Sequence, residues 1–123
     1  MQGGKAPTAA QRRWHQWLRD QGCACCGMPA EIHHCVGSTG KHRKIWIGQD
    51  FCLPLCPRHH RHEASIDKNT AQFVTEYYGE PRDIGRRGME KRIFAGLVAH
   101  YRRMKGELPC SAEVLAAIED WHR

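Results

Sequence analysis

Four segments of the chain carry apolar residues at the three- and four-residue spacing of an amphipathic helix. The first runs from Thr8, which can cap it, to about Asp20, and Gly22 ends it. The others span residues 69–78, residues 86–105, and the segment that follows Ser111. The apolar stripes consist of Trp14, Trp17, Leu18, Phe73, Val74, Tyr77, Met89, Ile93, Phe94, Leu97, Val98, Tyr101, Val114, Leu115, Ile118 and Trp121. The pattern predicts helices at both ends of the chain.

Between the first two helices the pattern changes to short apolar runs. Residues 32–36 and 51–55 are strand candidates, and a polar, glycine-containing basic loop over 37–44 follows the first of them. Cys56 and Pro57 stop the second strand, and Pro57 suits the first turn of a helix that we expect to reach about Ile66. The sequence therefore predicts an α+β fold in which two strands, joined by a long loop, lead into a helix.

The 123 residues suit one small domain, in which we expect only a modest core. We expect residues 1–7 to be frayed and residues 8–123 to form the domain. Its centre is the segment of about 23–66, and residues 69–123 form a helical C-terminal part. A cross-link such as a metal site would help a core of this size considerably.

The charge balance favours a polyanionic partner. The chain has 19 Lys and Arg against 13 Asp and Glu, a net charge of +6, and nucleic acid is the commonest partner of such a surplus. The cations nearest the candidate chemistry are the ones that we expect to contact DNA phosphates: Lys41, Arg43 and Lys44 in the basic loop beside Trp46, and Arg58 and Arg61 around His60. A merely solvated loop is the alternative interpretation.

The sequence indicates a reducing compartment and no membrane contact. Its start has no apolar segment of a signal peptide, and no run approaches the roughly 20 apolar residues that cross a bilayer. The seven cysteines are an odd number, and clustered Cys and His in a cytoplasmic protein indicate metal binding rather than disulfides. We expect the protein to be cytoplasmic.

Two pairs of metal-ligand residues share the same spacing. Cys23 and Cys26 are three residues apart, and so are Cys56 and His59. Zinc prefers four tetrahedral thiolate and imidazole ligands, and one turn can present both members of such a pair. The spacing predicts a structural Zn²⁺ site, with Cys25 as a competitor for the first pair and with small buried thiols as the alternative. Free core thiols are expected at Cys35, Cys52 and Cys110.

Three further histidines suggest a second, catalytic metal. His33 and His34 are adjacent, and His60 follows the expected zinc ligand His59. Hydrolysis of a phosphodiester needs a neutral imidazole as base and a cation that offsets charge on the leaving oxygen. We assign His34 as the base, His33 and His60 as metal ligands, and Asp50 as a further ligand or an orienter of an imidazole. Because alternation would turn His33 and His34 to opposite faces, we expect the strand to end or bend there.

These residues resemble a known family of nucleases. Glu-Ile-His-His at 31–34, followed by Asp-Phe-Cys-Leu-Pro-Leu-Cys-Pro-Arg-His-His at 50–60 with flanking zinc cysteines, is similar to HNH (His-Me finger, ββα-metal) endonucleases. The run His-His-x-x-Gly-Ser-x-Gly-Lys narrows the resemblance to the bacteriophage Ref-type recombination-enhancement branch. The similarity covers about residues 23–66.

The resemblance implies a zinc-stabilised ββα-metal core and metal-dependent nicking or cleavage of DNA, and we expect Mg²⁺ or Mn²⁺ as the catalytic ion. It places the base at His34, the metal ligands at His33 and His60, and the structural zinc on the four residues named above. It also implies action on RecA-coated DNA in phage recombination inside a bacterial host. Phe51 stands where the family has its central Asn, so we expect the neighbouring Asp50 to hold the catalytic loop.

Two other functions remain open from the residues. One is a non-catalytic zinc module that binds DNA or a recombination protein. The other is a small interaction protein in which both metal sites are structural. Because the donors are imidazoles without an assured carboxylate, the catalytic ion stays open among Mg²⁺, Mn²⁺, Ni²⁺ and Zn²⁺.

Overall fold

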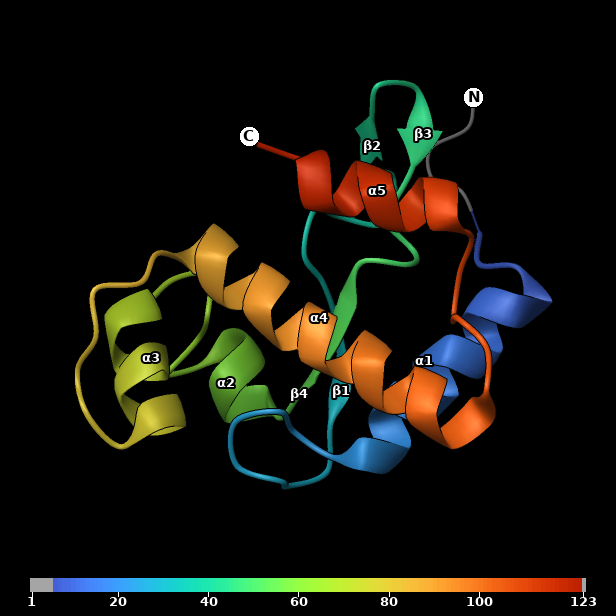
Figure 1. The fold of residues 1–123 in the computed structure, drawn as a ribbon. Coiled ribbons are helices and arrows are strands. Elements are labelled where there is room, and N and C mark those ends of the chain that lie inside the picture. Colours follow the sequence, from blue (N-terminus) through green and yellow to red (C-terminus); the bar gives the residue numbers. More distant parts are fainter. Residues whose placement is uncertain (1–5, 123) are drawn as a thin grey trace.

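The structure, a computed structural model, describes residues 6–122 and is α+β (Figure 1). The described helices are α1 (Ala9–Gln21), α2 (Pro57–Arg61), α3 (Thr70–Tyr78), α4 (Arg86–Lys105) and α5 (Ala112–Asp120). The described strands are β1 (Glu31–His34), β2 (Lys41–His42), β3 (Ile45–Trp46) and β4 (Cys52–Leu55). Most of the segment 1–7, for which fraying was expected, lies outside the described residues.

The expected helices are present, with one difference. Thr8 caps α1 through a reciprocal pair of hydrogen bonds with Gln11, and Ser111 caps α5. The helix after Pro57, however, ends at Arg61 rather than near Ile66. The reason is a turn in which the Ser65 hydroxyl donates to the carbonyl of His60 and the backbone N–H of Ile66 donates to His59. This turn buries Ile66 instead of continuing the helix.

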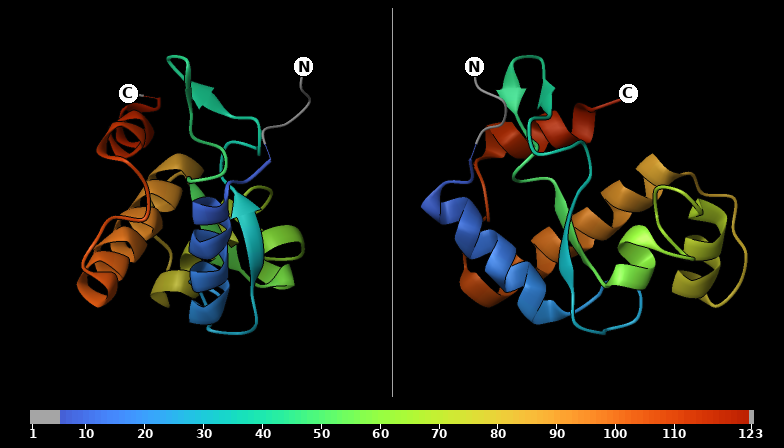
Figure 2. Two further views of the ribbon diagram at one scale, coloured as in Figure 1. Left: turned by 90° about the vertical axis from the view of Figure 1, so that its right-hand side faces the viewer. Right: turned by 180° about the vertical axis from the view of Figure 1, so that it is seen from behind.

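The central sheet is the antiparallel pair β1–β4, with His33 opposite Leu53 and His34 opposite Cys52. Every residue of β4 is buried. The front and back views place α1 on one side of this pair and α2 on the other, while α4 crosses beside β4 (Figures 1 and 2). Because this sheet has two strands, each of them has one edge without a paired strand among the described residues, and in the back view β1 lies in front of β4 and α4 (Figure 2).

The basic loop contains a small hairpin that the sequence pattern did not predict. Strands β2 and β3 pair, and Arg43 and Lys44 form the turn between them, both in the left-handed region with φ of 51° and 70°. The hairpin lies against α5, where Asp120 accepts a hydrogen bond from the His42 ring and pairs with Arg43. The C-terminal helix thereby fixes the position of the loop.

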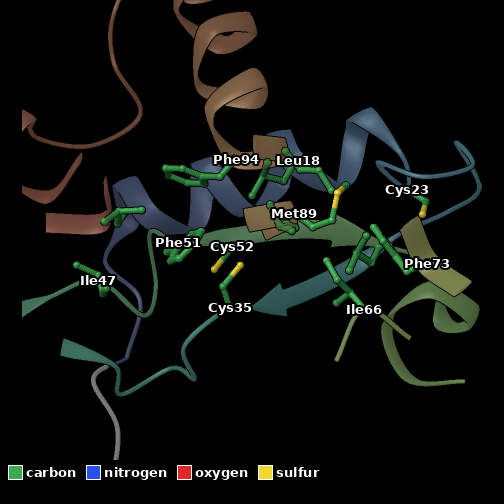
Figure 3. Close-up of a cluster of buried hydrophobic side chains, with 14 of the residues drawn as sticks. Leu18, Cys23, Cys35, Ile47, Phe51, Cys52, Ile66, Phe73, Met89 and Phe94 are labelled. Carbon is green, nitrogen blue, oxygen red and sulfur yellow. The ribbon is translucent and has the colours of Figure 1, made fainter. Parts of the chain in front are cut away.

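The core lies between the sheet and the helices (Figure 3). The Phe51 ring makes edge contacts with Phe94 of α4 and Trp121 after α5. On α1, Leu18 is fully buried and the indole N–H of Trp14 donates to the backbone carbonyl of Asp50. None of the described helices is long and apolar enough to span a membrane.

We predict that Phe51→Ala lowers the free energy of unfolding by about 3–5 kcal/mol, because Phe51, the residue before β4, is fully buried and contacts Phe94 of α4 and Trp121 after α5. Denaturant unfolding of the metal-loaded protein measures the change. The control, Met104→Ala, alters an exposed side chain and should change this free energy by less than about 0.5 kcal/mol. Equal effects of both substitutions would mean that Phe51 does not join these helices to the sheet.

Candidate functional site

The two predicted ligand pairs come together at one point. The ligand atoms of Cys23, Cys26, Cys56 and His59 all lie within 4.8 Å of one another. The Cys26 and Cys56 sulfurs are 3.7 Å apart, and the Cys23 sulfur lies 3.6 Å from Nδ1 of His59. Zn–S bonds of about 2.3 Å and Zn–N bonds of about 2.0 Å at tetrahedral angles give separations of about 3.8 and 3.5 Å. The cluster can therefore hold a metal such as zinc.

The backbone explains how this clasp, defined as Cys23, Cys26, Cys56 and His59, is assembled. Gly27 has φ of 79°, which closes the turn after the first cysteine pair, and its N–H donates to Cys23. The Ala24 N–H donates to Pro54 at the end of β4, so the turn is held beside the start of α2. Cys25, the competitor for the first pair, lies outside the cluster, and burial raises the pKa of its thiol to about 12.

A carboxylate holds the imidazole of the clasp from outside. Nε2 of His59 lies 2.7 Å from Oε1 of Glu76 on α3, which leaves Nδ1 to face the sulfurs. Hydrogen bonds from Arg58, then Gln72 and His59, lower the pKa of Glu76 to about 2. The stabilisation from this ionised carboxylate is therefore present above the ordinary pKa of a glutamate and is lost as the pH falls towards about 2.

A second cluster forms around His33 and His60. Their ring centroids are 5.2 Å apart, so a strand residue and a helix residue meet as expected. Nε2 of His33 lies 2.7 Å from Glu90 and 3.7 Å from Asp67, while Nδ1 of His60 lies 2.6 Å from Glu31. We define His33, His60, Glu31, Asp67 and Glu90 as the histidine–carboxylate cluster. Beside it, the Cys35 sulfur lies within 4.8 Å of ligand atoms of His33 and Glu90, and these three residues could hold a metal ion.

Glu90 is fully buried although it carries a carboxylate. It reaches from α4 to His33, and the Arg86 guanidinium lies 3.4 Å from both Glu90 and Asp67. Burial of an unpaired carboxylate would be strongly unfavourable, so these cationic or hydrogen-bonding partners are what make its position tolerable. The helical C-terminal part thus contributes directly to the histidine–carboxylate cluster.

His34 lies on the other face of β1. The strand was expected to end or bend at the adjacent histidines, and β1 does end at His34. His34 is still paired with Cys52, however, so alternation turns its side chain away from that of His33, and the expectation that both imidazoles face one site is wrong. Nε2 of His34 lies 3.0 Å from Oε1 of Gln49, and its ring contacts the ring of His15 on α1. An amide oxygen only accepts, so Nε2 donates this hydrogen bond and Nδ1 keeps a lone pair.

Asp50 does not reach either histidine cluster as the expected ligand. Its carboxylate accepts a hydrogen bond from the Gln11 side chain, and its backbone carbonyl accepts one from Trp14. Gln49, one residue earlier, is the side chain that contacts the ring of His34. Gln49 rather than Asp50 therefore contacts an imidazole of the predicted site, and its sequence neighbour Asp50 holds α1 through Gln11 and Trp14.

The five predicted DNA-contacting cations lie in different settings. Arg58 is held by Glu76 and Glu63, and Arg61 by Glu31, so both arginines are already paired. In the hairpin, Arg43 has a side chain that is 77% exposed, beside Asp120. Lys41 lies over the ring of Trp46, and exposed Lys44 completes the turn. The hairpin is therefore more available to a phosphate than the arginines around α2.

The sequence analysis did not identify several residues that contact the expected site residues: His15, Glu31, Gln49, Asp67, Glu76 and Glu90. One signal existed for Glu90, because it falls three residues before Ile93 and four before Phe94, on the apolar stripe of its helix. A charge at such a position has to be paired in the interior. The others carried no such signal.

Comparison with known proteins assigns the chain to a family without assigning it an activity. Residues 1–94 match the family DUF968, described as a protein of unknown function, and the chain belongs to this family. It is 32% identical over 95 residues to the uncharacterized protein YdfU of Escherichia coli K12, which covers 72% of this chain. The chain spans about a quarter (26%) of the length of that relative. No solved structure matches.

We predict that Glu76→Ala weakens metal binding at the clasp by about 10–100-fold, because it removes the group that orients His59. Competition with a chromophoric chelator measures the affinity. Glu63→Ala is the matched control, since Glu63 also pairs with Arg58, whereas the carboxylate that contacts His59 belongs to Glu76. Unchanged affinity in the Glu76 variant would show that this carboxylate does not orient the metal ligand.

Proposed function

We propose that this member of the DUF968 family is a metal-dependent DNA endonuclease with a ββα-metal core. The observation that carries the proposal is the convergence of His33 from β1 and His60 from α2, 5.2 Å apart, beside a clasp with zinc geometry. The antiparallel pair β1–β4 followed by α2 is the strand–strand–helix order of that core. The resemblance of residues 31–34 and 50–60 to HNH nucleases supports the same conclusion.

The clasp takes Zn²⁺ as a structural ion. Its three sulfurs and one imidazole are a closed tetrahedral set, which leaves no open position for a substrate. It joins the turn before β1 to the first turn of α2. In a small domain, such binding energy is also folding energy.

The histidine–carboxylate cluster takes the catalytic ion. His33 and His60 would hold it, with Glu90 and Asp67 as the carboxylates closest to His33. Mixed nitrogen and oxygen donors suit Mn²⁺ or Mg²⁺, the ions expected from the resemblance. When bound, such an ion supplies positive charge that offsets the charge on a scissile phosphate and its leaving oxygen.

His34 is the general base. Its Nε2–H is directed to Gln49, and this contact leaves the lone pair of Nδ1 available to take a proton from water. Gln49 is thus a positioning residue that selects the useful tautomer. The side chain of His34 is only partly buried, so water can reach it.

Because β1 lies at the edge of the sheet, one substrate can reach side chains on both of its faces. His34 lies on the α1 side and His33 on the α2 side, but both belong to a strand whose outer edge has no paired strand among the described residues. A phosphodiester backbone placed along this edge would meet the base from one face and the metal ligands from the other. In this proposal the DNA backbone therefore contacts side chains from both faces of β1.

The hairpin β2–β3 contacts the DNA backbone. Its turn places two cationic residues, Arg43 and Lys44, in left-handed conformations that cost L-residues roughly 1–2 kcal/mol each. Asn-Gly would form such a two-residue turn with less strain. Cations held at a strained tip are typical of a functional surface, and phosphate is the partner that the net charge of +6 favours.

One observation favours the alternative of a non-catalytic zinc module that binds DNA or a recombination protein. Arg86 lies 3.4 Å from both Glu90 and Asp67, so the carboxylates of the candidate catalytic site already have a cationic partner. A RecA-coated filament as the target and a phage origin are further parts of the proposal, supported by the resemblance alone. A cytoplasmic location is also part of it, supported by the cysteine usage.

We predict that His34→Ala slows nicking of supercoiled plasmid by about 10²–10⁴-fold, the usual contribution of a general base. The assay uses Mg²⁺ or Mn²⁺, with and without a RecA filament, and zinc content verifies the fold. His62→Ala is the control, because it removes an exposed imidazole at the end of α2. Equal nicking by both variants would contradict the role of His34, and a wild type that binds DNA without nicking it would favour the alternative.

We predict that Arg43→Asn combined with Lys44→Gly weakens DNA binding without lowering the free energy of unfolding, because Asn-Gly relaxes the strained turn. Loss of two phosphate contacts should reduce the slope of log K against log salt by about 1.8. The control, Arg102→Gln with Arg103→Gln, removes equal charge from exposed positions at the end of α4. An unchanged slope in the hairpin variant would remove the hairpin from the interface.

A further inference from the structure

A third group of ligand residues lies on the α1 side of the sheet. His15 of α1, His34 of β1 and Cys52 of β4 offer ligand atoms within 4.8 Å of one another. The Cys52 sulfur lies 3.6 Å from Nε2 of His15, and the rings of His15 and His34 have centroids 5.8 Å apart. These residues are distinct from the four of the clasp and from the histidine–carboxylate cluster across the strand.

We propose that His15, His34 and Cys52 form a separate Zn²⁺ site, and that its occupation removes His34 as a general base. The loss of His34 as a base rests on the proposed nuclease function, whereas the existence of the Zn²⁺ site does not. Two imidazoles and a thiolate are soft and borderline donors, which bind Zn²⁺ or Co²⁺ in preference to Mg²⁺. The ion that inhibits therefore differs from the ion that supports cleavage.

The surroundings of the three residues suit a cation. The backbone carbonyl oxygen of Gln49 lies 2.7 Å from Nε2 of His15, and its side-chain oxygen lies 3.0 Å from Nε2 of His34. The thiol of Cys52 is within 3.4 Å of the carbonyl oxygen of Gly48. The ligand atoms of the imidazoles and the thiol thus lie close to carbonyl oxygens and are held by hydrogen bonds. A single ion bound to these atoms can replace those hydrogen bonds. The partly exposed ring of His34 provides the entry from solvent.

Metal binding at this site has a defined proton balance. Zn²⁺ takes the place of the thiol proton of Cys52, which leaves to solvent, and both imidazoles bind in the neutral form. A ring that binds the ion through Nε2 must carry its proton on Nδ1. For His34 this is the opposite tautomer to the one that the hydrogen bond to Gln49 selects. The lone pair needed to accept a proton from water is then absent.

The test adds Co²⁺, under reducing conditions, to wild-type protein whose clasp already holds zinc. A sulfur-to-cobalt charge-transfer band is expected, because Cys52 supplies a thiolate. Cys52→Ser should abolish the band. Cys35→Ser is the matched control and should retain it, since Cys35 is also a fully buried free thiol but lies with His33 and Glu90. Zinc content and circular dichroism confirm that each variant folds.

A second variant keeps the test decisive if Cys52→Ser fails to fold. His15→Gln keeps the Cys52 thiol but removes one metal ligand. It should weaken Co²⁺ binding by at least about 10–100-fold, which is the usual loss when only a group that orients a ligand is removed. No band in the wild type, or a band that survives in Cys52→Ser, overturns the proposed site.

Nicking assays examine the consequence separately. Zn²⁺ should inhibit nicking by wild-type protein in Mn²⁺, and His15→Gln should require a higher Zn²⁺ concentration for the same inhibition. Equal sensitivity of the two proteins would overturn the inhibitory role. If the protein never nicks DNA, the nuclease proposal fails, while the cobalt band still decides whether the site exists.

Discussion

The clasp of three sulfurs and one imidazole is the constraint on which the rest of the structure depends. It joins the turn after α1 to the first turn of α2, and both strands of the central sheet lie between these two points in the chain. A domain of 123 residues has little core to spare for holding such a loop closed. His60 follows His59 directly, so the geometry of the clasp also sets where the neighbouring histidine lies.

The pairing of β1 with β4 then decides which side chains meet. The register places His33 and His34 on successive positions of one regular strand, so their side chains enter different environments. His33 faces carboxylates from α4 and the turn before α3 together with the ring of His60 and the thiol of Cys35. His34 faces the imidazole of His15 and the thiol of Cys52. The two adjacent histidines therefore lie in different environments, and the carboxylates of Glu90 and Asp67 distinguish the side of His33.

Glu90 connects the helical C-terminal part to the central sheet through its contact with His33. A fully buried carboxylate is tolerated only where partners compensate its charge, and His33 and Arg86 provide that compensation. Helix α4 is therefore a contributor to the site as well as a cover for the core. The hairpin is connected in a similar way, because Asp120 at the end of α5 holds His42 and Arg43.

The sequence by itself determined the features that depend on local spacing. Cys23, Cys26, Cys56 and His59 were identifiable because one turn presents two ligands three residues apart, and the long helices followed from their apolar stripes. Only the tertiary structure decided that Gln49 rather than Asp50 holds His34, that Glu90 reaches His33, and that His15 and Cys52 meet. These contacts join residues from different elements, and their positions depend on strand register and helix packing, which no local pattern encodes.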